Sequence, residues 1–90
     1  MPVIVHLQGT SFDRPVVHVR TGHAVKWVWP DDGVLHTVTS SGKRRFRSSG
    51  YRKRGARHRV VFRSPGTYRY HCEIHAGMRG RVIVSIPPKR

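Results

Sequence analysis

Short alternating apolar segments, separated by turn residues, are the feature that most limits what this chain can fold into. Apolar side chains recur at every second position in residues 3–7, 17–19 and 25–29, the pattern of strands buried on one face. Turn-forming groups rich in Gly, Pro and Ser separate such segments, among them Gly9-Thr10, Thr21-Gly22, Ser40-Ser41-Gly42 and Ser64-Pro65-Gly66. No apolar 3.6-residue period runs long enough to predict a helix of more than a turn or two. We therefore expect an all-β fold, a Greek-key β-sandwich of about six to eight strands in two antiparallel sheets.

The segment from Tyr70 to Met78 concentrates side chains that bind metals. The only cysteine, Cys72, is followed by His75 and Met78 at Cys-x-x-His-x-x-Met spacing in a short loop that contains a glycine. A thiolate, an imidazole and a weak thioether are ligands of a blue-copper electron-transfer site, which also needs a second imidazole. His36 is the candidate, in a segment (33–40) whose alternation predicts the start of a strand.

These features resemble the cupredoxins of the plastocyanin and amicyanin group. The likeness extends over most of the chain, through residues 25–29, 36–38, 64–72 and 80–84. The two residues between His75 and Met78 are similar to the short loop of amicyanin rather than the longer loop of plastocyanin. The resemblance implies a type 1 copper protein that binds one copper ion and carries single electrons between the Cu(I) and Cu(II) states.

The resemblance also implies the ligand set and the role of each ligand. His36, Cys72 and His75 would form a trigonal plane, and Met78 would be the weak axial ligand. In relatives the residue after the first histidine is commonly Asn, whose side chain ties that strand to the cysteine loop. Here it is Thr37, and we expect its shorter hydroxyl not to span the same gap.

Strand alternation separates the residues beside the cysteine into two faces. Tyr68, Tyr70 and Cys72 fall on one face, so His71 should point away from a metal at Cys72. In multicopper oxidases and copper nitrite reductases a histidine next to this cysteine ligates a further, catalytic copper. The chain has no His-x-His pair for such a cluster, so we expect no catalytic residues and no enzyme activity. We interpret His71 as solvent-facing or bonded within the loop, and the other histidines as surface residues: His6, His18, His23 and His58.

Other functions remain open from the residues alone. A single cysteine in a small domain is most often an inert buried thiol. A zinc site could use the same Cys and two His, although Met is a poor fourth ligand for zinc. A copper chaperone or storage domain would keep the metal and exchange it, but a closed site favours electron transfer over handover.

The charge of the chain is strongly unbalanced. Eighteen Lys and Arg residues face four acidic ones, giving a formal charge of +14, and ten of the basic residues fall between Lys43 and Arg63. Such a field attracts anionic partners. We expect an anionic redox protein as the partner of a monomer, with an anionic membrane surface as a further possibility. The alternative function is a basic polyanion or nucleic-acid-binding β module, in which Phe46 and Tyr51 would stack on bases.

Length and hydropathy limit the organisation of the chain. Ninety residues predict one copper-binding domain, residues 1–90, and one cysteine allows no internal disulfide. No apolar run approaches the length of about 20 residues that spans a bilayer, and the N-terminus lacks the apolar core of a secretory signal. Copper carriers of the resembled family work outside the cytoplasm. We therefore expect a periplasmic or other extracytoplasmic location, with any leader or anchor outside this chain.

Overall fold

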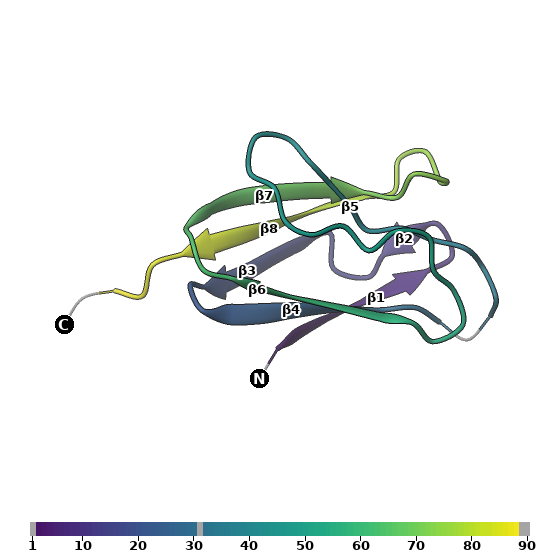
Figure 1. The fold of residues 1–90 in the computed structure, drawn as a ribbon, viewed down its shortest axis with the longest axis horizontal. Coiled ribbons are helices and arrows are strands. Elements are labelled where there is room, and N and C mark those ends of the chain that lie inside the picture. Colours follow the sequence, from purple (N-terminus) through teal and green to yellow (C-terminus); the bar gives the residue numbers. More distant parts are fainter. Residues whose placement is uncertain (1, 31, 89–90) are drawn as a thin grey trace.

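Eight strands in two sheets build the part of the chain that the computed structural model describes, residues 2–30 and 32–88. Figure 1 shows the two layers and the strand labels. The strands are β1 (Val3–Gln8), β2 (Ser11–Phe12), β3 (Val16–Arg20), β4 (His23–Val28), β5 (Thr39–Ser41), β6 (Arg57–Phe62), β7 (Gly66–His71) and β8 (Arg79–Ser85). These ranges contain no helix, so no helix in them could cross a membrane. The predicted all-β sandwich is confirmed.

The sheets are mixed rather than purely antiparallel. One sheet has the order β2-β1-β4-β6 and the other the order β3-β8-β7-β5. Strand β1 pairs in parallel with β4, and β3 pairs in parallel with β8. The expectation of antiparallel sheets was therefore wrong for these two pairs. Parallel neighbours require a crossover connection, and here the chain makes each crossover by passing through the opposite sheet.

The core lies between the two sheets and follows from the alternation in the sequence. In β7 the side chains of Tyr68 and Tyr70 are buried. Thr67, before the first tyrosine, and Arg69, between the two, are exposed. Trp27 of β4 is fully buried at the centre of an aromatic cluster. Its ring stacks on Phe46 at a centroid distance of 5.4 Å and meets the edge of Tyr70 at 5.2 Å. The aromatic residues of this cluster thus join both sheets and the long connection that carries Phe46.

That connection, from β5 to β6, is rich in Lys and Arg and is fastened to the sandwich by polar contacts. The hydroxyls of Ser48 and Ser49 accept hydrogen bonds from the backbone N–H groups of Ser40 and Val38 at 2.9 and 2.8 Å. His58 donates a hydrogen bond from Nε2 to the carbonyl oxygen of Arg47 at 2.6 Å.

The prediction that His58 lies on the surface was therefore wrong. It occupies an inward position of β6, directly opposite Trp27 in the strand register, and is 3% exposed. The other three histidines assigned to the surface, His6, His18 and His23, are exposed.

Candidate metal centre

Cys72 is delivered to the interior by the alternation of β7. It follows the buried Tyr68 and Tyr70 at the same spacing of two and is 5% exposed. His71 falls on the opposite face, where its Nε2 lies 2.9 Å from the carboxylate of Glu73. The prediction that His71 points away from Cys72 and bonds within the loop is thus met. Glu73, two residues further along the chain, provides this bond.

The loop after Cys72 is closed by its own backbone. The N–H of Cys72 donates to the carbonyl of Met78 at 2.9 Å, and the N–H of Met78 donates to the carbonyl of His75 at 3.1 Å. Gly77, with φ of +83°, supplies the left-handed conformation that this tight return needs. The loop therefore holds Cys72, His75 and Met78 in one small unit, in which Met78 is buried and His75 is half-buried.

His36 reaches the same place from the connection between β4 and β5. Its N–H donates to the carbonyl of Arg52 at 3.0 Å, and its carbonyl accepts from the N–H of Arg52 at 3.1 Å. The indole of Trp29 donates a further hydrogen bond to the His36 carbonyl at 3.2 Å. The side chain is fully buried.

The expected strand start at residues 33–40 needs correction. His36 forms only an isolated bridge with Arg52, and β5 begins at Thr39. Instead of alternating, His36, Thr37 and Val38 are all buried. The bridge to Arg52 was not foreseen, since nothing in the sequence marks a backbone contact within a run of basic residues.

The three donor atoms converge. The Nδ1 atoms of His36 and His75 lie 4.0 and 3.6 Å from Cys72 Sγ, and the potential ligand atoms of the three residues are all within 4.8 Å of one another. The two imidazole rings are 4.8 Å apart between centroids. One sulfur and two nitrogens in this arrangement match the trigonal donor set of a blue-copper site.

Thr37 links the His36 segment to the cysteine loop in two ways. Its N–H lies 3.4 Å from Cys72 Sγ, a contact that favours the thiolate, and its hydroxyl accepts a hydrogen bond from the N–H of Glu73 at 2.8 Å. The same hydroxyl is 2.8 Å from that of Thr39. The expectation that a threonine hydroxyl would not span this gap was therefore wrong, because the two backbones approach closely enough for a short side chain.

Electrostatics keeps His36 available as a ligand. Burial and, next, the neighbouring His75 lower the pKa of His36 below its ordinary value, against a smaller opposing effect of Asp32. A neutral imidazole with a free lone pair is the form that binds a metal. The donor set fits copper better than zinc, because the buried thioether of Met78 in the same loop is a soft ligand.

Comparisons with known proteins agree with this geometry. A family model described as copper binding proteins of the plastocyanin/azurin family matches residues 3–85. The chain is 29% identical to amicyanin of Paracoccus denitrificans over 91 residues, covering 91% of this chain and 64% of that protein. It is also 29% identical to amicyanin-alpha of Methylorubrum extorquens AM1, covering 89% of this chain and 69% of that protein. The chain thus spans about two thirds of the length of these relatives.

Two solved structures show the same architecture. An oxidized amicyanin variant superposes with a TM-score of 0.82 at 25% identity, over 93% of this chain and 82% of that chain. A copper-containing nitrite reductase from Thermus scotoductus SA-01 gives a TM-score of 0.83 at 28% identity, covering 98% of this chain but only 23% of the reductase. With a family match along nearly its whole length and a convergent Cys and His donor set, this chain belongs to the plastocyanin/azurin family of copper-binding proteins.

Proposed function

We propose that this protein is a type 1 blue-copper electron carrier whose single copper is held by His36, Cys72, His75 and Met78. The observation that carries the proposal is the convergence of the His36, Cys72 and His75 donor atoms within 4.8 Å of one another. Bound copper supplies a one-electron couple between Cu(I) and Cu(II). No activity beyond electron transfer is proposed, and residues 1–90 act as one copper-binding domain.

The residues divide the work of holding the ion. Cys72 provides a thiolate, favoured by the N–H of Thr37, and His36 provides a neutral imidazole clamped by the backbone of Arg52. Met78 provides a weak fourth contact that tunes the potential. Because both sheets and the closed loop fix these side chains, the site changes little between the two charge states, which keeps the cost of reorganisation low.

Burial favours electron cycling over copper handover. His36, Cys72 and Met78 are each 5% exposed or less, so an incoming carrier could not reach them without opening the loop. Only His75 is half-buried, and it provides the edge through which electrons pass. The nitrite reductase likeness does not extend the proposal to catalysis, since His71 is engaged by Glu73 and one group of metal-ligating residues occurs in residues 2–30 and 32–88.

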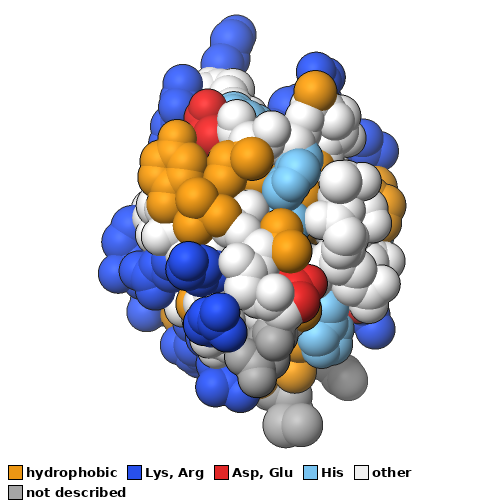
Figure 2. Space-filling view, turned by 90° about the vertical axis from the view of Figure 1, so that its right-hand side faces the viewer, with side chains coloured by type: hydrophobic (Ala, Val, Ile, Leu, Met, Phe, Trp, Pro, Cys, Tyr) orange, Lys and Arg blue, Asp and Glu red, His pale blue; other side chains and the backbone are white. Residues whose placement is uncertain are grey.

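The surface around His75 supports docking of a redox protein. The exposed side chains of Val34, Leu35 and Ile74 flank the two histidine segments. Figure 2 shows this end of the molecule, where hydrophobic side chains lie beside a histidine and Lys and Arg gather to one side. We propose a partner protein with an acidic rim, which the net charge of +14 would attract. We also propose that the carrier acts as a monomer outside the cytoplasm, as the family resemblance suggests.

The test is the colour of the copper-loaded protein. One equivalent of Cu(II) should give an intense blue thiolate charge-transfer band and a type 1 paramagnetic-resonance spectrum. Cys72→Ala should abolish the band, whereas His71→Ala, which removes the adjacent histidine from the outer face, should keep it. A colourless parent protein, or a Cys72→Ala variant with the parent absorption, would refute the ligand assignment.

A second substitution tests Met78. Met78→Leu should preserve folding and copper binding while raising the reduction potential, because the weak axial donor is lost. Voltammetry measures the change. An unaltered potential would show that Met78 is not an axial ligand.

A further inference from the structure

A pocket of about 370 Å³ opens beside the cysteine loop, on the outer face of the sheet β3-β8-β7-β5. Its sheet side is formed by Ser41 of β5, Arg69 and His71 of β7, and Arg79 of β8, and its other side by the loop residues Ala76 and Gly77. The pocket therefore combines cationic side chains with the segment that carries Cys72 and His75.

The cations around this pocket are crowded together by the strand register. Arg69 lies directly opposite Arg81, and His71 lies directly opposite Arg79. Like charges placed opposite each other on neighbouring strands destabilise a sheet. Across the described ranges, neither Lys nor Arg forms an ion pair with a carboxylate, and the nearby carboxylate of Glu73 is engaged by His71 at 2.9 Å. Arg69 and Arg79 thus bring unneutralised charge to the wall of the pocket, and Arg81 lies next to that wall, opposite Arg69 in the register.

We propose that this pocket binds a small oxyanion, a phosphate or a carboxylate, next to the metal centre. Guanidinium groups bind both kinds of oxyanion through paired charge-assisted hydrogen bonds. The Ser41 hydroxyl adds a neutral donor, and the volume falls within the range of small-ligand sites. A bound anion would relieve the repulsion between Arg69 and Arg81.

The position of the pocket gives the anion a second effect. Negative charge beside the cysteine loop stabilises the more positive state of a redox ion in the centre, so the anion should lower the reduction potential. This effect depends on the proposed electron-carrier function. The binding itself does not, because it uses only the arginines and the serine.

Binding is tested by amide NMR on the copper(I)-loaded protein and on the protein as purified. Inorganic phosphate is titrated at constant ionic strength against chloride, and citrate forms a second arm that distinguishes a polycarboxylate from a phosphate source. We expect saturable shifts centred on residues 69, 71, 79 and 81 with at least one of the two anions, and the tighter one identifies the ligand source. The proposal would be overturned if the amide shifts with phosphate and citrate equalled those with chloride alone. It would also be overturned if the shifts saturated with neither anion.

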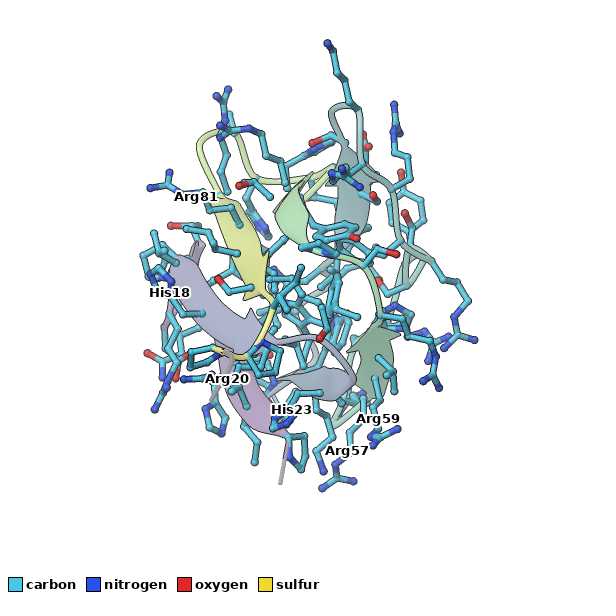
Figure 3. The ribbon with its side chains drawn as sticks, turned by 90° about the vertical axis from the view of Figure 1, so that its left-hand side faces the viewer. His18, Arg20, His23, Arg57, Arg59 and Arg81 are labelled. Atoms are coloured by element: carbon cyan, nitrogen blue, oxygen red, sulfur yellow. The ribbon has the colours of Figure 1, made fainter. Side chains whose placement is uncertain are left out.

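Charge-matched variants separate a specific site from general attraction. Arg69→Gln and Arg79→Gln, which change the two arginines that line the pocket, should each weaken binding about tenfold or more, the usual loss for a hydrogen bond to a charged group. Arg57→Gln and Arg59→Gln remove the same charge from β6 of the other sheet and should change binding less than twofold. Figure 3 shows Arg57 and Arg59 on the opposite side of the molecule from Arg81. Equal losses in both pairs would overturn a localised site.

The effect on the metal is measured by voltammetry with and without the bound anion. The potential should fall on saturation in the parent protein and stay constant in Arg69→Gln. Saturable binding without a shift would overturn the placement beside the metal. If the protein binds no copper at all, the electron-carrier proposal fails while the NMR titration still decides whether the anion binds.

Discussion

Thr37 joins the two halves of the metal site through a single short side chain. Its hydroxyl accepts from the N–H of Glu73 at 2.8 Å, and its own N–H approaches Cys72 Sγ at 3.4 Å. The residue is 1% exposed, so its hydroxyl lies away from solvent. A buried donor left without a partner costs about 1–3 kcal/mol. The stability of the cysteine loop should therefore depend on one hydroxyl group.

Thr37→Val tests this dependence because it keeps the shape of the side chain and removes the hydroxyl. We expect it to lower the free energy of unfolding by about 1–3 kcal/mol and to shift the reduction potential, as measured by urea unfolding and voltammetry. Thr37→Ser keeps the hydroxyl and should retain both properties more closely. Equal behaviour of the two variants would mean that the hydroxyl does not hold the loop.

His58 should make the fold sensitive to acid. Burial is the main cause that lowers the pKa of His58, with the charges of Arg47 and Arg52 acting in the same direction and the Arg47 carbonyl opposing them. The unfolded chain then binds the proton more readily than the folded one, so stability is full above about pH 6.5, the ordinary value of histidine, and decreases as the pH falls below it.

The variant His58→Gln checks this effect, because the glutamine amide can still donate to the Arg47 carbonyl but does not titrate. Urea unfolding at pH 7.5 and pH 5 should show a smaller loss of stability in the variant than in the parent. The metal-free variant should still lose some stability at pH 5, since the pKa of His36 is lowered as well. An identical loss in parent and variant would exclude His58 as a source of the acid sensitivity.

At the scale of elements, Tyr70 of β7 lies directly opposite Gly80 of β8. A Cβ atom on Gly80 would overlap Cζ and the hydroxyl of Tyr70 and would lie 2.8 Å from Cε2. The tyrosine hydroxyl is buried with no hydrogen-bond partner in residues 2–30 and 32–88, and burial raises the pKa of Tyr70 to about 12. The ring therefore packs against the bare backbone of β8.

Gly80→Ala should consequently lower the free energy of unfolding by about 1–3 kcal/mol, the usual cost of overpacking a core. In a Tyr70→Val background the same substitution should cost much less, because the overlapping ring atoms are gone. Denaturant unfolding of the four proteins in this cycle measures the coupling. Additive losses would show that Gly80 and Tyr70 do not compete for the same space.

The elements also show what the sequence could and could not predict. Period-two alternation indicated which side chains of β4 and β7 face inward, and with them the direction of Cys72, because alternation depends only on local backbone geometry. It carried no information about which strand lies beside which, so the parallel pairs β1–β4 and β3–β8 were missed. His58 was misassigned for a related reason: it was interpreted as lying on a polar face or in a turn, whereas its pairing with Trp27 decides its burial.

The sequence predicted the ligands in the loop after β7 more directly than the ligand in the segment before β5. Cys72, His75 and Met78 share one loop, so their spacing alone indicated a common site. His36 could be assigned only through the family resemblance, because its approach depends on the backbone bridge to Arg52 and the indole of Trp29. Neither contact has a sequence pattern of its own.

At the scale of the whole molecule, the basic charge should govern encounters at the metal end. The connection that carries Arg52 reaches that end through the bridge to His36, and the exposed Lys53 follows directly. At the other end, Arg20 of β3 lies near the turn to β4, as Figure 3 shows. Charges close to the site of electron exit should influence rates more than charges far from it, within the screening length of about 8 Å at physiological salt.

Oxidation of the copper(I) protein by hexacyanoferrate(III), a small anionic oxidant, should therefore slow as the ionic strength rises. Lys53→Glu should lower the rate at low salt more than Arg20→Glu, which makes the same charge change at the far end. Stopped-flow spectroscopy measures both. A rate independent of salt, or equal effects of the two variants, would show that the basic connection does not steer anions to the site.

The metal ligands and the end of β8 lie at opposite ends of a particle about 47 Å long and only 26 by 18 Å across. In Figure 1 the β7–β8 loop is at one end and the chain leaves β8 at the other. A protein tethered to an electrode through residues added after β8 would stand with its redox end toward solution, whereas adsorption through the loop would bring that end against the conductor. The end that is anchored thus decides whether the copper site exchanges electrons with species in solution or directly with the electrode.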